Sequence, residues 1–267
     1  MRTIIKSAAN PKVKLAVSLH QRKHRESEQL FLAEGVRLVE MAAHSGWEIA
    51  YGFYTMEAAK EPRIEALLTE LEDRCTLYEV PVPLFHRISE TQSPQGIMLV
   101  MQLQHAEIDL RSLLRRKKPL VIALDNVQDP GNVGTIIRTA DAAGVDGVVL
   151  LGDSADAFSA KTVRASMGSI FHVPVISNIQ RGKFLHELEE WGVALFAADI
   201  DMTAITYFQQ DFREAAAIVF GNEANGISAD ILARSKKIYI PMQGHAESLN
   251  VAVAAGIMLY EVYRQRN

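Results

Sequence analysis

Three short segments in the second half of the chain place polar side chains directly after apolar runs of strand length. Residues 120–124 precede the first segment, residues 216–220 the second, and residues 238–242 the third. Buried parallel strands show continuous apolar runs of this kind, and ligands bind beyond the carboxyl ends of such strands. We therefore expect the three segments to form one site. Their groups capable of chemistry are those of Asn126, Asn132, Arg138, Glu223, Ser248 and Asn250.

The elements around the first segment predict a strand–helix–strand unit. Residues 120–124 read as a strand, apolar residues at helical spacing from Ile136 onward read as a helix that stops at Gly144, and residues 145–151 read as a second strand. A helical crossover joins parallel strands, so the sheet is predicted to be parallel.

The third segment leads into a helix. Ser248 is expected to cap a helix that runs from Leu249 to about Arg264, and Asn250 then falls in its first turn. Leu249, Val253, Ile257 and Tyr260 share one face of this helix at the spacing of an amphipathic element.

Composition excludes several classes of protein. The 267 residues are 48% hydrophobic, which is enough to bury one large core or two modest ones. There is no apolar run of membrane-spanning length and no signal-peptide core, so a cytoplasmic location is expected. Cys75 is the one cysteine, which excludes an intrachain disulfide and a cysteine-rich metal cluster, and no metal is expected. No dinucleotide or nucleoside-triphosphate fingerprint occurs.

The charge is unevenly distributed. The whole chain carries a formal charge of -4, yet residues 1–25 hold seven of its 28 basic residues and no acidic one, which leaves 21 basic against 32 acidic residues, or -11, in the remainder. A basic arm on an acidic body suits a polyanion partner, although a solvated basic helix would look the same. The seven residues are Arg2, Lys6, Lys12, Lys14, Arg22, Lys23 and Arg25.

The pattern along the chain divides it into four parts. We expect a basic N-terminal arm at 1–25, a small α/β domain at 26–105, a linker at 106–118 and a larger α/β domain at 119–267. In the small domain, strands are predicted at 29–33, 49–54, 77–80 and 96–102, with helices between 35 and 46 and between 57 and 74.

Three motifs carry a family resemblance. The segments DPGNVGTIIRTADAAG, FGNEANGIS and IPMQGHAESLNVAVAAGIMLYE are similar to those of the SpoU or TrmH-type RNA ribose methyltransferases of the SPOUT superfamily, over residues 119–264. FLAEGVRLVE and SPQGIMLV resemble the RNA-binding domain that often precedes such a catalytic domain. The resemblance implies an α/β SPOUT domain with a parallel sheet and a deep trefoil knot, preceded by a small α/β RNA-binding domain.

The resemblance also implies a cofactor and a set of site residues. S-adenosylmethionine would be held largely by backbone groups around Gly221, Ile240, Met242 and Leu249; without the resemblance, Ile240 and Leu249 would be taken as core residues. Arg138 would be the catalytic arginine, Asn132 would fix the ribose or phosphate, and Glu223 and Asn250 would complete a polar ring. The predicted catalytic set is Arg138, Asn132, Glu223, Ser248 and Asn250.

The predicted chemistry is methyl transfer to a ribose 2′-hydroxyl. A sulfonium methyl is already electrophilic, so the protein must align the hydroxyl and make its oxygen more nucleophilic. A guanidinium keeps its proton at neutral pH, so Arg138 is expected to grip a substrate phosphate, and the proton leaves to that phosphate, to Glu223 or to the arginine itself. An alternative role for Glu223 is to cap backbone amides of its own loop.

The predicted substrate is structured RNA, with ribosomal RNA favoured over transfer RNA. The alternatives are an RNA-binding or ribosome-assembly protein without catalysis, a tRNA-directed 2′-O-methyltransferase and a base-methylating enzyme. A homodimer through the last helix is expected, with contacts at Val251, Ala252, Ala255 and Met258. Roles for His245, which could border the site, and for Arg164, which could bind RNA or hold its loop, stay open.

Overall fold

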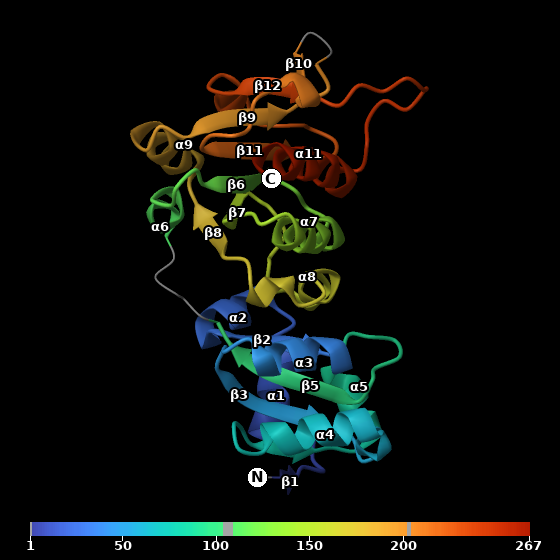
Figure 1. The fold of residues 1–267 in the computed structure, drawn as a ribbon. Coiled ribbons are helices and arrows are strands. Elements are labelled where there is room, and N and C mark those ends of the chain that lie inside the picture. The colour runs from blue at the N-terminus through green and yellow to red at the C-terminus, as the bar shows by residue number, and fades with distance from the viewer. Residues whose placement is uncertain (1, 104–108, 202–203) are drawn as a thin grey trace. The chain divides into compact units, whose positions relative to one another are not determined.

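The computed structural model describes residues 2–103, 109–201 and 204–267, which form two compact units. The first unit comprises Met1–His105 and Phe158–Phe171, and the second comprises Ala106–Ala157 and His172–Asn267. Figure 1 colours the chain from one end to the other and labels its elements. In the described residues we find no helix whose length and apolar character would let it cross a bilayer.

The first unit is built on a five-stranded sheet of order β1-β4-β3-β5-β2. Strands β1, β4 and β3 are parallel to one another, whereas β5 runs antiparallel to both β3 and β2. Its elements are β1 (Arg2–Ile4), α1 (Pro11–Ser18), α2 (Arg22–Glu28), β2 (Leu30–Glu34), α3 (Val36–His44), β3 (Ile49–Tyr54), η1 (Ala58–Lys60), α4 (Pro62–Leu71), β4 (Leu77–Glu79), α5 (Val82–Ile88), β5 (Ile97–Gln102), α8 (Ala160–Ala165) and η2 (Ser169–Phe171).

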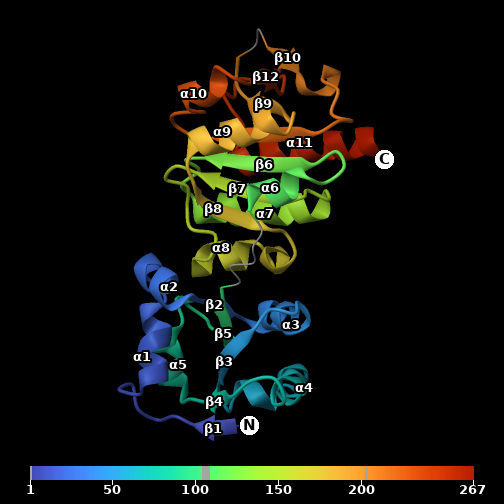
Figure 2. The same cartoon turned by 90° about the vertical axis from the view of Figure 1, so that its left-hand side faces the viewer.

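Helices cover both faces of this sheet. In Figure 2, α1 and α5 lie on one face and α3 and α4 on the other. On the α1 and α5 side, Val13, Leu19 and Phe85 pack with Phe53 and Val100 of the strands in one buried cluster. Alternate residues of a strand face opposite sides of the sheet, so the sheet can pack against a layer of helices on each face.

The basic segment at 1–25 is part of this core. Val13, Ala16 and Leu19 repeat every third residue and are buried, whereas Lys12 and Lys14 on either side of Val13 are exposed. The buried Arg25 donates a 2.6 Å hydrogen bond to the carbonyl oxygen of Leu19, at the end of α1. The structure therefore differs from the expected separate arm. The apolar stripe of Val13, Ala16 and Leu19 packs α1 against the sheet, and Lys12 and Lys14 remain exposed to solvent.

A segment from the middle of the chain completes the first unit. Helix α8 packs beside β2, and the rings of Phe31 and Phe158 have centroids 5.1 Å apart. The indole Nε1 of Trp47 donates a 3.2 Å hydrogen bond to the carbonyl oxygen of Phe171. Residues 158–171 thus contribute aromatic side chains to the core of the small unit, which the sequence-based division did not predict.

The second unit is built on a seven-stranded sheet of order β10-β12-β9-β11-β6-β7-β8. Every neighbouring pair of strands is parallel, which confirms the predicted parallel α/β sheet. Its elements are α6 (Leu110–Leu114), β6 (Leu120–Asp125), α7 (Pro130–Ala142), β7 (Gly147–Leu151), β8 (Val175–Ile179), α9 (Arg181–Glu190), β9 (Ala194–Ala198), β10 (Ile205–Thr206), η3 (Tyr207–Gln209), β11 (Ala216–Gly221), α10 (Ala229–Leu232), β12 (Lys236–Tyr239) and α11 (Val251–Arg266).

Two layers of helices enclose the centre of this sheet. Figure 1 shows α6 and α9 on one side and α7 and α11 on the other. Val121 and Ala123 pack with Leu113 and Phe184 in the cluster under α6 and α9. Helices α7 and α11 pack on each other, where Thr139 lies beside Gly256. Continuous apolar strands are expected when both faces of a parallel sheet are covered.

Several predicted elements differ from those observed. The expected helix at 57–74 is divided by Pro62, which begins α4 at a position where its missing N–H costs nothing. Part of the expected linker forms α6, whose Leu110 and Leu113 are buried; residues 106–108 lie outside the described residues.

Candidate active site

A buried carboxylate lies beneath the carboxyl edge of the second sheet. Asp125, the last residue of β6, has no exposed surface. Its Oδ1 accepts a 2.7 Å hydrogen bond from Nε of Arg181 at the start of α9, and its Oδ2 accepts a 2.7 Å bond from the backbone amide of Ser228. A buried charge needs such partners. Asp125 thereby fixes the loop after β11 and the start of α9 to the end of β6.

The loop after β11 is tightly folded. Gly221 ends β11 in register with Asp125, and a Cβ at this position would lie 2.4 Å from the backbone carbonyl carbon of Gly226. Asn222 and Gly226 exchange two backbone hydrogen bonds, at 3.0 and 2.9 Å. Only a glycine permits this close approach, so Gly221 has a packing reason of its own to be glycine.

Three predicted site residues are joined by hydrogen bonds. The side-chain Nδ2 of Asn132 donates to Oε1 of Glu223 at 2.6 Å, and Oδ1 of Asn132 accepts from Nδ2 of Asn250 at 3.0 Å. These residues come from α7, from the loop after β11 and from the start of α11. The three motif segments therefore meet at one place, as their sequence context predicts.

The site lies between two helix N-termini. Asp129 caps α7 by accepting a 2.9 Å hydrogen bond from the amide of Asn132, and Asn250 caps α11 by accepting from the amides of Ala252 and Val253. Helix N-termini carry partial positive charge and bind anions such as phosphate. The arrangement therefore suits a ligand with negative charge.

The expected cap of the last helix was wrong. Asn250, not Ser248, is the N-cap, and α11 begins at Val251. Ser248 is exposed in the preceding loop and makes no hydrogen bond within the described ranges. An asparagine and a serine two residues apart are both good caps, so the sequence alone did not separate them.

Arg138 lies on the same helix as Asn132, six residues and about 9 Å further along the axis. Its side chain is exposed, and among the residues that the structure describes it has neither a hydrogen bond nor an ion pair. Most exposed arginines of this unit are paired, such as Arg213 with Asp211 at 2.7 Å. Arg138 is therefore a guanidinium available to a ligand.

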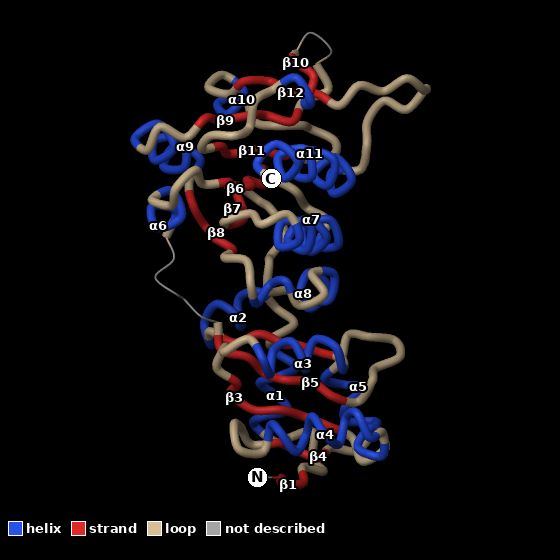
Figure 3. Tube along the Cα trace, viewed as in Figure 1, coloured by secondary structure: helices blue, strands red, loops and turns tan. Residues whose placement is uncertain are grey.

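The predicted cofactor residues are not gathered into one pocket. Gly221 is half-buried at the end of β11, whereas residues 241–250 are all exposed. Met242 and Leu249 each have 37% of their surface exposed. In Figure 3 the loop between β12 and α11 extends away from the sheet. Ile240 lies at its beginning, directly after β12, and no described hydrogen bond joins Gly221 to this loop.

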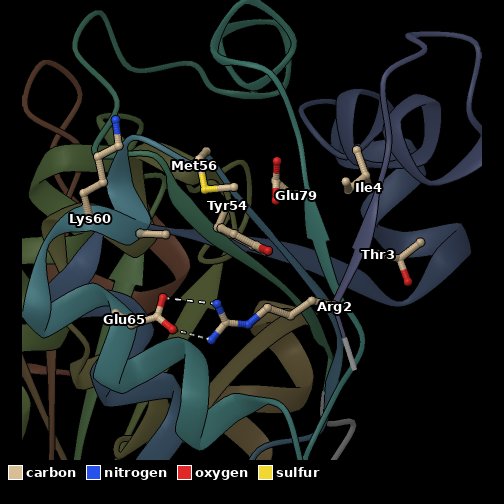
Figure 4. A pocket seen from close by; sticks show the side chains of 9 residues that line it. Arg2, Thr3, Ile4, Tyr54, Met56, Lys60, Glu65 and Glu79 are labelled. Atoms are coloured by element: carbon tan, nitrogen blue, oxygen red, sulfur yellow. Dashed lines mark hydrogen bonds and ion pairs between the residues drawn. The ribbon is translucent and has the colours of Figure 1, made fainter.

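The first unit contains a separate pocket of about 420 Å³. Figure 4 shows the guanidinium of Arg2 held there by the carboxylate of Glu65, at 2.8 Å. Glu72 binds the same guanidinium at 2.6 Å, and the hydrogen bond with Glu65 raises the pKa of Arg2 above its ordinary value. The charge of Arg2 is thus already neutralised, and the pocket is no anion site.

Sequence reasoning missed three residues that build the site. Asp125 and Arg181 form the buried ion pair, and Asn222 accepts hydrogen bonds at 2.9 Å from the amides of Ala224 and Asn225. Asn222 therefore caps the loop amides, which was the alternative role considered for Glu223. The sequence did contain a signal for Asp125, because it is a charged residue at the end of the otherwise apolar strand β6.

The remaining candidates are peripheral to this cluster. Arg164 belongs to the first unit, and its Nη1 is buried without a hydrogen-bond partner. His172 pairs with Asp141 at 3.3 Å. His245 is exposed in the loop at 241–250. Within the described ranges, no group of histidine, cysteine or acidic side chains could hold a metal ion.

Comparison with known families identifies two segments of the chain. Residues 119–260 match the model described as the SpoU rRNA Methylase family, and residues 10–99 match the MRM3-like substrate binding domain. The first match covers the candidate site and ends within α11. The second covers most of the first unit, including α1.

Relatives match the chain over nearly its full length. It is 38% identical to the 23S rRNA (guanosine(2553)-2′-O)-methyltransferase RlmP of Bacillus subtilis, over 97% of this chain and 98% of that protein. The structure of an AdoMet-bound rRNA methyltransferase from Sinorhizobium meliloti superposes with a TM-score of 0.87, at 34% identity and 98% coverage of each chain. The SpoU methyltransferase AviRb from Streptomyces viridochromogenes, in complex with AdoMet, gives 0.86 at 29% identity, over 96% of this chain and 98% of that chain.

Proposed function

Because the chain belongs to the SpoU rRNA methylase family, we propose that it transfers a methyl group from S-adenosylmethionine to a ribose 2′-hydroxyl of ribosomal RNA. The Bacillus subtilis and Sinorhizobium meliloti relatives are named as rRNA methyltransferases, and the two solved structures hold the same cofactor. Methylation of ribosomal RNA agrees with the cytoplasmic location expected from the sequence.

The observation that carries the proposal is the hydrogen-bonded series Glu223–Asn132–Asn250, together with Arg138 on the same helix α7, which has no partner within the described residues. A protein that kept only the scaffold would have no need for two amides and a carboxylate to be aligned across three distant segments. Such alignment is what positions a reacting group. The series supports an enzyme over a binding protein without catalysis.

The residues proposed for the cofactor fit it in chemical type. Residues 241–249 make no hydrogen bond in the described part of the chain, so their backbone donors and acceptors are free to read the polar edge of a ligand. Met242 and Leu249 expose apolar side chains on the same loop, which suits an adenine ring. Gly221, Ile240, Met242 and Leu249 are the residues that we propose to hold S-adenosylmethionine, which supplies an electrophilic methyl group when bound.

The protein's own contribution is to position and polarise the hydroxyl. We propose that Arg138 binds a phosphate of the RNA through paired N–H donors, since a guanidinium offers a planar fork that matches phosphate oxygens. The N-termini of α7 and α11 strengthen the same attraction. Asn132 then orients the ribose, and Glu223 is placed to accept the departing proton, directly or through the phosphate. Ser248 completes the proposed set, on the loop that adjoins Asn250.

The first unit supplies a second RNA contact. Four of its exposed basic residues lie on α1 and α2, and the first 25 positions hold no acidic residue. RNA phosphates are bound by such clusters in a salt-dependent way. We propose this basic face, defined by Lys12, Lys14, Arg22 and Lys23, as the part of the substrate-binding unit that contacts the RNA backbone.

We also propose a knot and a dimer, as the family resemblance implies. The contact between Asn132 and Asn250 brings the start of α11 beside the start of α7, and Asn132 in turn binds Glu223 in the loop after β11; this arrangement supports threading of α11 in a trefoil knot. The residues expected at a dimer contact need correction: Val251, Ala252, Ala255 and Met258 are buried within one chain because α11 turns that face to the sheet. Val253, Tyr260 and Tyr263 are exposed instead, and these are the residues that we propose for the contact.

The test is methyl transfer with purified protein. Labelled S-adenosylmethionine is incubated with ribosomal RNA, and separately with transfer RNA, from a strain that lacks the gene. A 2′-O-methylated nucleotide in ribosomal RNA supports the proposal and gives its position. Methylation of transfer RNA alone would show that the substrate is transfer RNA, and methylation of a base would show that the reaction is not ribose methylation. Binding of ribosomal RNA without transfer would favour the assembly protein.

A further inference from the structure

The side chain of Asn222 holds the loop that carries Glu223. Its Nδ2 donates a 2.9 Å hydrogen bond to the carbonyl oxygen of Asn126, which directly follows β6. Its Oδ1 accepts two hydrogen bonds of 2.9 Å, from the amides of Ala224 and Asn225. One amide group therefore fastens both the inside of the loop and the neighbouring strand end.

The support beneath this anchor is itself rigid. Asn126 adopts a left-handed backbone conformation with φ of 57°, and its Oδ1 accepts a 2.9 Å hydrogen bond from the amide of Asp153. The preceding residue is the buried Asp125, which binds Ser228 on the far side of the same loop. The loop at 222–226 is thus tied to the sheet on both sides of Glu223.

Glu223 depends on this anchoring. It is exposed, and in the ranges that the structure describes its one hydrogen-bond partner is Asn132. An exposed carboxylate on a short turn would otherwise sample many positions, and its contact with Asn132 would be lost for much of the time. Fixing the turn reduces that freedom before any ligand binds.

We propose that Asn222 is the positioning residue for the Glu223 carboxylate. It does not touch the reacting atoms; it sets the place from which Glu223 reaches Asn132. The inference rests on the proposed function for its kinetic consequence, whereas its structural consequence can be measured without catalysis.

The kinetic test is a double-mutant cycle. Asn222→Asp keeps an oxygen for the amides of Ala224 and Asn225 but loses the donor to Asn126, so the loop can fold while its anchor is gone. We expect kcat to fall about tenfold with KM for S-adenosylmethionine within about threefold, and the same change to cost less than about twofold in a Glu223→Gln background. A full tenfold loss in the Glu223→Gln background would overturn the proposal. Asn225→Ala is the matched control, because its side chain has no described partner.

The structural test uses the Asn132 side-chain amide as a reporter. In ¹⁵N-labelled full-length protein, Glu223→Ala removes its acceptor and defines the shifted resonance. Asn222→Asp is expected to move the same resonance toward that position, and Asn225→Ala to leave it in place. An unmoved resonance in Asn222→Asp overturns the proposal. If the unaltered protein transfers no methyl group, the proposed function fails, and the resonance alone then decides the role of Asn222.

Discussion

Asn132 donates a 2.6 Å hydrogen bond to Glu223, a residue 91 positions later in the chain. Its other amide atom, Oδ1, accepts from Asn250 at 3.0 Å, so both ends of one side chain are occupied. A rotation of the amide by 180° would set oxygen against carboxylate and break both contacts, which fixes the orientation of the group. Asn132 is therefore aligned by two loops before an RNA molecule arrives.

Two substitutions at Asn250 should separate its two roles. Asn250→Asp keeps the oxygen that caps α11 but replaces the donor to Asn132 with a second acceptor. We expect the thermal midpoint to stay unchanged and methyl transfer to fall about tenfold. Asn250→Ala loses the cap as well, which costs about 1 kcal/mol of the free energy of unfolding. Calorimetry and a transfer assay check both; an Asn250→Asp protein of normal activity would show that the contact with Asn132 is dispensable.

Removal of the Arg138 guanidinium should abolish transfer without affecting the fold. The side chain is exposed and unpaired in the described structure, so Arg138→Ala is expected to change the free energy of unfolding by less than about 0.5 kcal/mol. Loss of a charge-stabilising donor typically costs a factor of about 100 to 1,000 in kcat. Arg138→Lys should recover little, because an ammonium cannot form the paired contact with phosphate.

The matched control for Arg138 is Arg234→Ala. Arg234 is another exposed arginine of the second unit, with a loose ion pair of 3.9 Å to Glu189. It should transfer methyl groups at the unaltered rate. S-adenosylmethionine affinity, measured by calorimetry, should stay within a few fold in both variants. Normal turnover by Arg138→Ala would remove the residue from the mechanism.

The sequence predicted the central elements of the second unit well. Apolar runs such as 120–124 and 145–151 are long, uninterrupted and bounded by turn residues, so strands β6 and β7 and the helix between them were placed correctly. It also predicted that Asn132, Glu223 and Asn250 meet, because strand ends of one parallel sheet share an edge. What it could not predict was the partner of each atom, which depends on side-chain orientation rather than on position along the chain.

The failures have specific physical reasons. The segment at 158–171 packs with Phe31 and Trp47, and a contact over such a sequence distance leaves no periodic signal. The dimer residues were misplaced because both faces of α11 carry apolar residues: Val251, Ala255 and Met258 are buried, whereas the predicted face with Val253 and Tyr260 is exposed. Apolar spacing alone therefore did not identify the inner face. The basic stretch at 1–25 concealed a buried stripe of only Val13, Ala16 and Leu19, since its charges dominate the composition.

Neutralising the basic face should weaken RNA binding in a salt-dependent way. Combined replacement of Lys12, Lys14, Arg22 and Lys23 by alanine removes four cationic side chains that are exposed on α1 and α2. Each lost phosphate contact lowers the slope of log affinity against log salt by about 0.7 to 0.9, so the loss of four contacts should lower it by about 2.8 to 3.6. Filter binding of ribosomal RNA fragments at several salt concentrations measures it.

The control for the basic face is Lys60→Ala. Lys60 belongs to the same unit but lines the pocket that contains Glu65 and Glu79, where a polyanion is repelled. Its replacement should leave affinity and salt slope unchanged. Cofactor binding should be normal in all these variants. An unaltered slope in the fourfold variant would place the RNA contact elsewhere on the protein.

A methyl group at Gly221 should displace the loop that carries Glu223. The added carbon of Gly221→Ala would lie 2.4 Å from the carbonyl carbon of Gly226 and 2.6 Å from the amide nitrogen of Ile227. Both are backbone atoms, so relief requires the loop itself to move. Overpacking of this kind costs about 1 to 3 kcal/mol of the free energy of unfolding. Because Gly221 is also proposed to contact the cofactor, affinity for S-adenosylmethionine should fall together with kcat.

Gly182→Ala is the control: an added Cβ there meets nothing within 4 Å, and alanine favours the helix α9 in which it lies. Gly221→Ala with normal cofactor affinity and turnover would show that the loop after β11 tolerates displacement, and that its tight fold serves stability rather than the site.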